Sequence, residues 1–268
     1  MKSLLYLKNT LSILTILVLL ASMSACTETD DANPIAPDVP PTATMVMEID
    51  DAFTSKSAAT KAHFNAAAIQ VGVWNTILTV SLVVPVAAFS AIIHNEVPTF
   101  EDGTWTWDSD FNVGVVAHNA RLEATVTGNN VNWKMYISKE GEYTDFLWYT
   151  GTSVIGNTSG QWILNADPNN STPFLQIDWE VDNNGVTQIR YTNIIPAHND
   201  EGGYIQYGVT ENNPDYDAFY TIYHTDGDFQ VDIEWNRITK AGRIKNPNHF
   251  LDNIWHCWDS TFQSIACE

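Results

Sequence analysis

Two patterns of hydrophobic residues divide the chain, and the change falls at Gly103. Residues Ala66–Ile93 form a run of 28 residues without a charged side chain. After Gly103, apolar residues alternate with polar ones, which is the period of β-strands with one buried face. The sequence therefore predicts an apolar helical segment followed by an antiparallel β domain.

The apolar segment is predicted to be a helix or a helix pair. Many alanines favour a helix that begins near Thr54 or Ser55, and Pro98 would end it. Pro85 lies inside the segment and removes one backbone hydrogen bond. We therefore expect a split at Leu82–Val84, with Pro85 in the first turn of the second helix.

A helix that is apolar on every side has to be buried, either in the protein or in a membrane. Its length permits a membrane span, since about 20 apolar residues suffice. However, polar residues such as Gln70, Asn75 and Ser90 are scattered through it, and Gly72 and Pro85 interrupt it. These features favour packing inside or against the β domain, with a transmembrane segment as the alternative.

The β domain shows its clearest alternation in two segments. Within Phe174–Val181 and Phe229–Asn236, the odd-numbered positions from 175 and 229 onward are apolar and the even-numbered positions between them are polar. We count about ten such segments, joined mostly by short turns. This arrangement is typical of an antiparallel meander, either an up-and-down barrel or a strongly curved sheet, packed around the apolar helix.

The charge balance is strongly acidic, with 12 Lys and Arg against 32 Asp and Glu, a formal net charge of −20. Such a surface argues against nucleic acid as a partner, because phosphates need a basic footprint. It argues equally against docking on anionic lipid through a basic patch. A solvated, exported surface is the interpretation that we favour.

The N-terminus reads as a secretory signal peptide over residues 1–25. Two lysines precede the apolar stretch Leu11–Leu20, and small residues then lead to Cys26. The four residues ending at Cys26 resemble the lipobox of bacterial lipoproteins, with Met23 in the place of the usual leucine. This resemblance implies cleavage before Cys26 and attachment of diacylglycerol to its sulfur, so that the chain is anchored to a membrane.

Residues 26–53 are predicted to be an acidic, proline-rich tether that follows the lipidated cysteine. The acids Glu28, Asp30 and Asp31 resemble the export signal of cell-surface lipoproteins in the Bacteroidota. The resemblance implies an exported protein that is lipid-anchored in the outer membrane and faces either the periplasm or the cell surface. Residues 54–97 would form the helical part and residues 98–268 the β part of a single globular domain.

Cys257 and Cys267 remain after Cys26 is assigned to the lipid. They lie ten positions apart near the C-terminus of an exported chain, and a disulfide is expected between them. It would stabilise the fold by about 2–3 kcal/mol on the chain-entropy model.

Catalytic motifs are absent from the sequence. It has no Gly-x-Ser-x-Gly elbow, no phosphate-binding glycine loop and no His-Glu-x-x-His pair. Asp178 with Glu180, and Asp232 with Glu234, lie on the polar faces of the two clearest strands, where solvated side chains are expected. We therefore predict no enzymatic activity, no metal and no cofactor.

The aromatic residues are the best indication of binding. The chain has ten Trp, ten Tyr and eleven Phe. If their rings were exposed, they would suit stacking on sugars, whereas the alternative is an aromatic-rich core. The candidate ligand-binding residues are Trp105, Trp107, Trp133, Trp148 and Tyr149.

Three functions remain open at this point. The first is a non-enzymatic, lipid-anchored envelope protein that holds a hydrophobic or lipid-like ligand inside the β structure. The second is a surface carbohydrate-binding lipoprotein, and the third is a hydrolase with a carboxylate pair. An open apolar cavity beside the helix would favour the first, exposed rings the second, and two facing carboxyls in a cleft the third.

Overall fold

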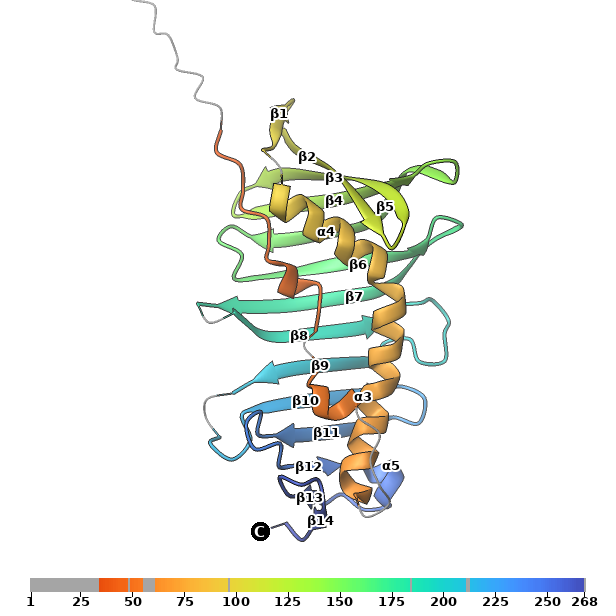
Figure 1. Ribbon diagram of the computed structural model, residues 1–268, viewed down its shortest axis with the longest axis vertical. Helices are drawn as coiled ribbons and strands as arrows, with labels where there is room; N and C mark the ends of the chain where they lie inside the picture. The colour runs from red at the N-terminus through yellow and green to blue at the C-terminus, as the bar shows by residue number, and fades with distance from the viewer. Residues whose placement is uncertain are drawn as a thin grey trace, which may run out of the picture. The chain divides into compact units, whose positions relative to one another are not determined.

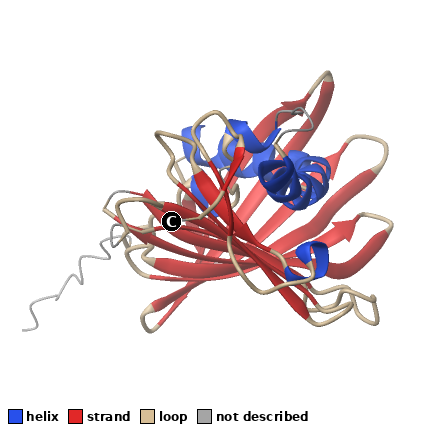
Figure 2. Cartoon of the chain, turned by 90° about the horizontal axis from the view of Figure 1, so that it is seen from below, coloured by secondary structure: helices blue, strands red, loops and turns tan. Residues whose placement is uncertain are grey.

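The computed structural model describes residues 34–267, apart from residues 48, 55–60, 96, 184 and 211–212. From Ala36 onward the chain forms one compact unit. The predicted signal peptide, Cys26 and the proposed export signal lie outside the described residues. Within the unit, one large antiparallel sheet carries long helices on one of its faces (Figures 1 and 2).

The sheet is a meander, because each strand pairs with the strands that precede and follow it in the chain. The strands are β1 (Thr99–Glu101), β2 (Thr104–Val113), β3 (Val116–Thr127), β4 (Asn130–Lys139), β5 (Tyr143–Val154), β6 (Ser159–Asp167), β7 (Asn170–Asp182), β8 (Gly185–Asn193), β9 (Tyr204–Val209), β10 (Ala218–His224), β11 (Phe229–Trp235), β12 (Gly242–Lys245), β13 (His256–Trp258) and β14 (Ser264–Ile265). The helices are η1 (Thr42–Thr44), α2 (Asp51–Thr54), α3 (Ala62–Ser81), α4 (Val83–Asn95) and α5 (Pro247–Phe250).

The mainly β class and the antiparallel meander are confirmed, but two details differ. The described residues hold fourteen strands rather than about ten, and the sheet is open, with β1 and β14 at its two ends. The additional strands include β1, β13 and β14, which have three residues or fewer, too short to show an alternating pattern. Helices cover the apolar face of the sheet, and the sheet does not close into a barrel.

The two clearest strands alternate as predicted. In β7, Leu175, Ile177 and Trp179 are buried, and in β11 Val231, Ile233 and Trp235 are buried. Polar residues between them face the side that carries no helices. One face of the sheet is thus apolar and covered, and the other is polar.

Of the two predicted alternatives, one helix or a helix pair, the structure shows the pair, and its break lies at the predicted place. Leu82 separates α3 from α4, and Pro85 is buried in the first turn of α4. Proline has no backbone N–H to donate to Ser81, so the helix cannot continue unbroken at this point. The two helices meet at an angle of 63°. The predicted start near Ser55 lies outside the described residues, and α3 begins at Ala62.

Within the part of the chain that the structure describes, no single helix has the length and hydropathy of a membrane span. Helices α3 and α4 reach that length and hydropathy only when they are counted together, and the pair is bent.

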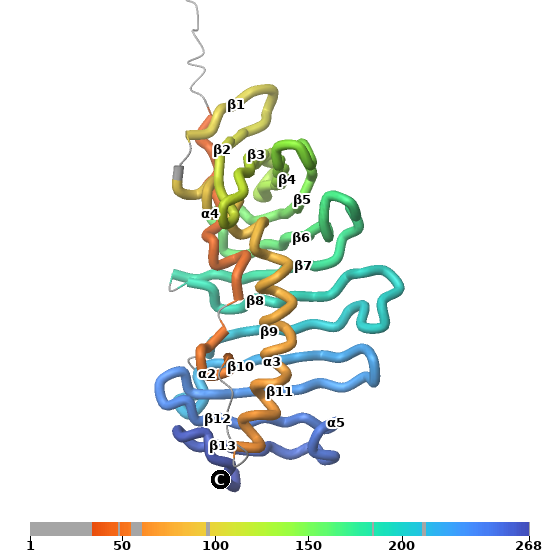
Figure 3. The backbone as a smooth tube through the Cα atoms, turned by 45° about the vertical axis from the view of Figure 1, so that its right-hand side comes forward, coloured from red at the N-terminus to blue at the C-terminus, as the bar shows by residue number. Residues whose placement is uncertain are grey.

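The predicted tether is wrong from Ala36 onward, because the chain belongs to the compact unit from that residue. We call residues Ala36–Thr54 the strap, because this segment runs across the strands beside α3 on the apolar face (Figures 1 and 3). Met45, Met47 and Phe53 are buried there, with 0–5% of their surface exposed. The prolines and acids made the segment look too polar to pack, but these three side chains fill the apolar face.

The C-terminal disulfide between Cys257 and Cys267 is present, as predicted. Cys257 belongs to β13 and is buried, whereas Cys267 follows β14. The bond therefore holds the last residues of the chain against the end of the sheet.

Aromatic rings lie over glycines in directly paired positions of neighbouring strands. Trp162 covers Gly151 and Trp179 covers Gly160. A methyl group at Gly160 would overlap the Trp179 ring and lie 2.5 Å from the carbonyl oxygen of Thr152. Glycine is required here because the ring takes the space that a side chain would need.

We expect Gly160→Ala to lower the free energy of unfolding by about 1–3 kcal/mol, because the ring and the strand must shift to admit the methyl group. Gly72→Ala is the matched control. Gly72 lies in α3 with no atom within 4 Å of an added Cβ, so the same substitution should stabilise the protein by about 0.5–1 kcal/mol through its helix propensity. Urea unfolding measures both, and a Gly160→Ala protein as stable as the wild type would contradict this packing.

Candidate functional site: a cavity beneath the helix break

The strap passes beneath the break between α3 and α4, and a cavity of about 460 Å³ lies between them. Its walls come from three parts of the chain: the strap, the helix pair and one core residue of β8. The lining residues are Thr42, Val46, Met47, Ile49, Asn75, Leu78, Thr79, Leu82, Val83, Val86, Ala87, Ser90 and Tyr191.

The cavity exists because the helix pair touches the sheet mainly at its two ends. The first part of α3 packs on β12–β14, and α4 packs on β2 and β3. Between these contacts η1 of the strap lies on β7 and β8, under α4. The bend that Pro85 imposes near Leu82 falls over the strap, and the apolar space opens at this bend.

Among the described residues that line the cavity, none carries a charged side chain. Its polar groups are the side chains of Thr42, Asn75, Thr79 and Ser90 and the hydroxyl of Tyr191. That hydroxyl accepts a hydrogen bond from the Met47 amide at 2.6 Å and donates one to the Met45 carbonyl at 2.9 Å. Burial raises the pKa of Tyr191 well above its usual value, although the Met47 hydrogen bond opposes the shift. The described lining of the cavity is therefore electrically neutral.

The strap is held by the polar atoms of aromatic side chains that rise from the sheet. Trp162 of β6 donates its Nε1 hydrogen to Thr44 Oγ1 at 3.2 Å, and Tyr191 of β8 binds the backbone of Met45 and Met47. These rings are buried, and their one polar atom each points at the strap. Strands β6 and β8 thus hold the strap, which forms one wall of the cavity.

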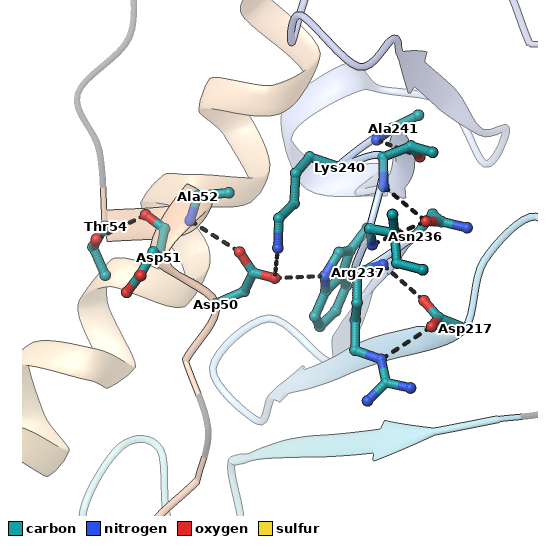
Figure 4. Close-up of polar contacts among 12 residues, drawn as sticks. Asp50, Asp51, Ala52, Thr54, Asp217, Asn236, Arg237, Lys240 and Ala241 are labelled. Carbon is teal, nitrogen blue, oxygen red and sulfur yellow. Dashed lines mark hydrogen bonds and ion pairs between the residues drawn. The ribbon is translucent and has the colours of Figure 1, made fainter.

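Asp50 fastens the far end of the strap (Figure 4). Its Oδ2 accepts hydrogen bonds from Lys240 Nζ at 2.6 Å and from Trp235 Nε1 at 3.3 Å, and its Oδ1 accepts one from the Ala52 amide at 3.0 Å. The Asp50 side chain is 11% exposed and that of Lys240 is 35% exposed. Burial acts to raise the pKa of Asp50, but the hydrogen bonds from Lys240, Ala52 and Trp235 and the charge of Lys240 outweigh it and lower the pKa below its usual value.

The five predicted ligand-binding residues do not form a binding surface. All of them are buried in the core, and none lines the cavity. The exposed fraction is 7% for Trp105 and Trp148, 4% for Trp107, 1% for Trp133 and 0% for Tyr149. Their place on the covered face of the sheet is the reason, and a β-bulge between Met135 and Tyr136 lets Trp148 share that face with Tyr149.

The carboxylate pairs lie on the uncovered, polar face, as expected. Asp178 accepts hydrogen bonds from Gln161 at 2.8 Å and Gln176 at 2.9 Å. Asp232 forms an ion pair with Lys245 at 2.8 Å. Among the described residues, no group of three His, Cys, Asp or Glu side chains is placed to hold a metal ion.

Comparisons with protein-family models, with curated proteins and with solved structures find no match for this chain.

Sequence reasoning missed the cavity, although it contained one signal. Asn75, Thr79 and Ser90 stand out as polar residues within an otherwise apolar helical segment, and all three line the cavity. Tyr191 and the strap residues gave no such signal, because their role depends on a contact between segments about 145 positions apart in the chain.

We expect Asp50→Asn to lower the free energy of unfolding by about 1–2 kcal/mol at pH 7, because it removes the charge that Lys240 and Trp235 bind. The folded-state pKa of Asp50 lies below the unfolded value. The stabilisation is therefore complete above that unfolded value and disappears as the pH falls through the folded pKa, below about 4.

Urea unfolding of wild type and variant at pH 7 and at pH 3 measures this difference. Asp226→Asn, in the exposed turn between β10 and β11, is the control and should change stability by less than about 0.5 kcal/mol. A deficit in Asp50→Asn that stays the same at both pH values would contradict a role for the charge.

Proposed function

We propose that this protein is a lipid-anchored, non-enzymatic protein of the cell envelope that binds an uncharged hydrophobic or lipid-like ligand in the cavity beneath the helix break. The observation that carries the proposal is the cavity itself. Its volume of about 460 Å³ falls in the range of about 300–1,000 Å³ that is typical of small-molecule sites.

The chemistry of the lining supports a neutral ligand with an apolar body. Aliphatic side chains from both helices and from the strap form most of the walls. A carboxylate or an ammonium group placed there would find no opposite charge among the described lining residues, and burying it would be costly. The hydroxyl and amide groups of Asn75, Thr79 and Ser90 would instead suit a hydroxyl, ester or amide head group.

A carbohydrate-binding function is supported less well, because the rings proposed for it are buried in the core. A hydrolase is also supported less well, because Asp178 and Asp232 are each bound by neighbouring side chains on an uncovered face rather than facing another carboxyl in a cleft.

The proposed anchor is the lipid on Cys26. Since the strap begins at Ala36, the tether between lipid and folded unit is shorter than the sequence suggested, with nine residues between Cys26 and Ala36. An outer-membrane lipoprotein, facing the periplasm or the cell surface, is the localisation that we propose from the lipobox-like residues and the acids that follow them.

Ala87→Phe should weaken ligand binding by about tenfold or more, because Ala87 lines the cavity and the added ring would fill it. The measurement is fluorescence titration with N-phenyl-1-naphthylamine, an uncharged apolar probe. Ala62→Phe is the matched control, because it places the same ring at an exposed position at the start of α3. This variant should bind the probe like the wild type. Equal affinity of all three proteins would show that the probe binds elsewhere.

Labelled palmitate should enter the wild-type protein expressed in a bacterial host and should not enter Cys26→Ser, because the sulfur of Cys26 is the proposed attachment site. Cys267→Ser removes a different cysteine and should keep the label. Equal labelling of Cys26→Ser and the wild type would rule out this anchor.

A further inference from the structure

The outer face of α3 carries a row of exposed aliphatic side chains, which we call the outer stripe. It consists of Ile69, Val73, Ile77 and Val80, and it continues to Val83 at the start of α4. Each of these side chains is 45–72% exposed. Their spacing of three or four residues places them on one side of the helix, away from the sheet.

The outer stripe lies on a stretch of the chain without charged residues. No Asp, Glu, Lys or Arg occurs between Ala62 and Asn95, although the chain has 12 basic and 32 acidic residues elsewhere. A partner that is recognised through charge would find no charged group on this stretch of the chain to bind. The face suits an apolar or net-neutral surface.

The outer stripe is continuous with the cavity. Val83 belongs to both, and Asn75 and Thr79, which line the cavity, are sequence neighbours of the stripe along α3. Thr79 and Val83 are also exposed. The cavity therefore reaches the protein surface at the edge of the outer stripe.

We propose that the outer stripe docks on the surface of a lipid bilayer with net-neutral head groups, and that docking places the mouth of the cavity at the membrane. This inference rests on the proposed function. An apolar ligand then passes between the bilayer and the cavity without entering water. Entering water is the most costly step in the transfer of an apolar molecule.

The chain before the folded unit favours a membrane over other occupants. Ten residue steps separate Cys26 from Ala36, which span at most about 36 Å. The strap then contacts the β5–β6 turn through Asp38 and Asn157 and reaches the cavity at Thr42. A lipid on Cys26 would hold the cavity within a short distance of the bilayer and leave the unit free to turn its outer stripe toward it.

A second copy of the chain is a poorer occupant. Five partly exposed aliphatic side chains offer roughly 300 Å² of apolar surface, given about 60–120 Å² for a whole side chain of this kind. A stable protein interface buries about 800 Å² on each partner. The outer stripe is also one helix wide and is convex, so it offers little complementarity to itself.

The test uses the chain from residue 26 with Cys26→Ser, which contains the whole compact unit and lacks the lipid that would otherwise dominate membrane binding. It is floated with phosphatidylcholine vesicles, and the bound fraction is measured. The double variant Val73→Glu, Val80→Glu should bind at least about tenfold more weakly, because two charges in the outer stripe would have to enter the interface. Vesicles that contain phosphatidylglycerol should bind the unmodified stripe less well, because the chain is strongly acidic.

The matched control adds the same two charges at exposed aliphatic positions outside the outer stripe, Val126→Glu with Ile155→Glu, and should bind vesicles like the parent chain. Titration with N-phenyl-1-naphthylamine is run in parallel on all three proteins. Loss of vesicle binding with unchanged probe affinity supports docking through the stripe.

Equal vesicle binding by the parent and the Val73→Glu, Val80→Glu variant overturns the inference. So does a parent chain that ignores vesicles but forms a dimer which the same two substitutions abolish, because the outer stripe would then be an interface between copies. If no protein binds the probe while vesicle binding still depends on the stripe, the cavity function fails and the docking surface remains.

Discussion

The apolar face of a single open sheet has to be covered, and the rest of this structure follows from that need. A sheet with one hydrophobic face is stable only when a second layer buries that face. Here the second layer is thin. It consists of one bent helix pair and the strap, lying side by side across the strands (Figure 3). The helix is apolar around most of its circumference because one side faces the sheet and the strap, while the outer stripe stays uncovered.

The two parts of the cover are held in different ways. The helix pair is held by packing, for example Phe64 against Trp258 and Phe89 against Trp162, with ring centroids 5.6 and 5.4 Å apart. The strap is held by hydrogen bonds from aromatic side chains and by the Asp50–Lys240 ion pair. The helix bends at Pro85 while the strap is fixed to the sheet beneath it, so a space remains between them. The cavity therefore exists because the helix pair and the strap are attached to the sheet in two different ways.

The opposite face of the sheet needs no cover because its side chains satisfy one another and the solvent. Arg190 of β8 donates to Gln206 of β9 at 2.8 Å, and Arg243 of β12 binds Glu234 of β11 at 2.6 Å. Several arginines also stack on aromatic rings there, as Arg121 does on Tyr136 at 4.2 Å. Arg190 and Arg243 are thus engaged in cross-strand contacts, and the acids leave this face well solvated.

Local pattern determined much of this fold by itself. The alternation in β7 and β11, the break before Pro85 and the disulfide of Cys257 with Cys267 are each set by residues close in the chain. The same pattern placed Trp105 and Trp107 on one face, but it could not say whether that face is exposed or covered, because the cover comes from another segment. Only the tertiary structure decided that the strap packs, that the sheet stays open and that Asn75 and Tyr191 meet at one cavity. Those outcomes depend on contacts between segments that are distant in the chain, and such contacts produce no periodic pattern of residues in the sequence.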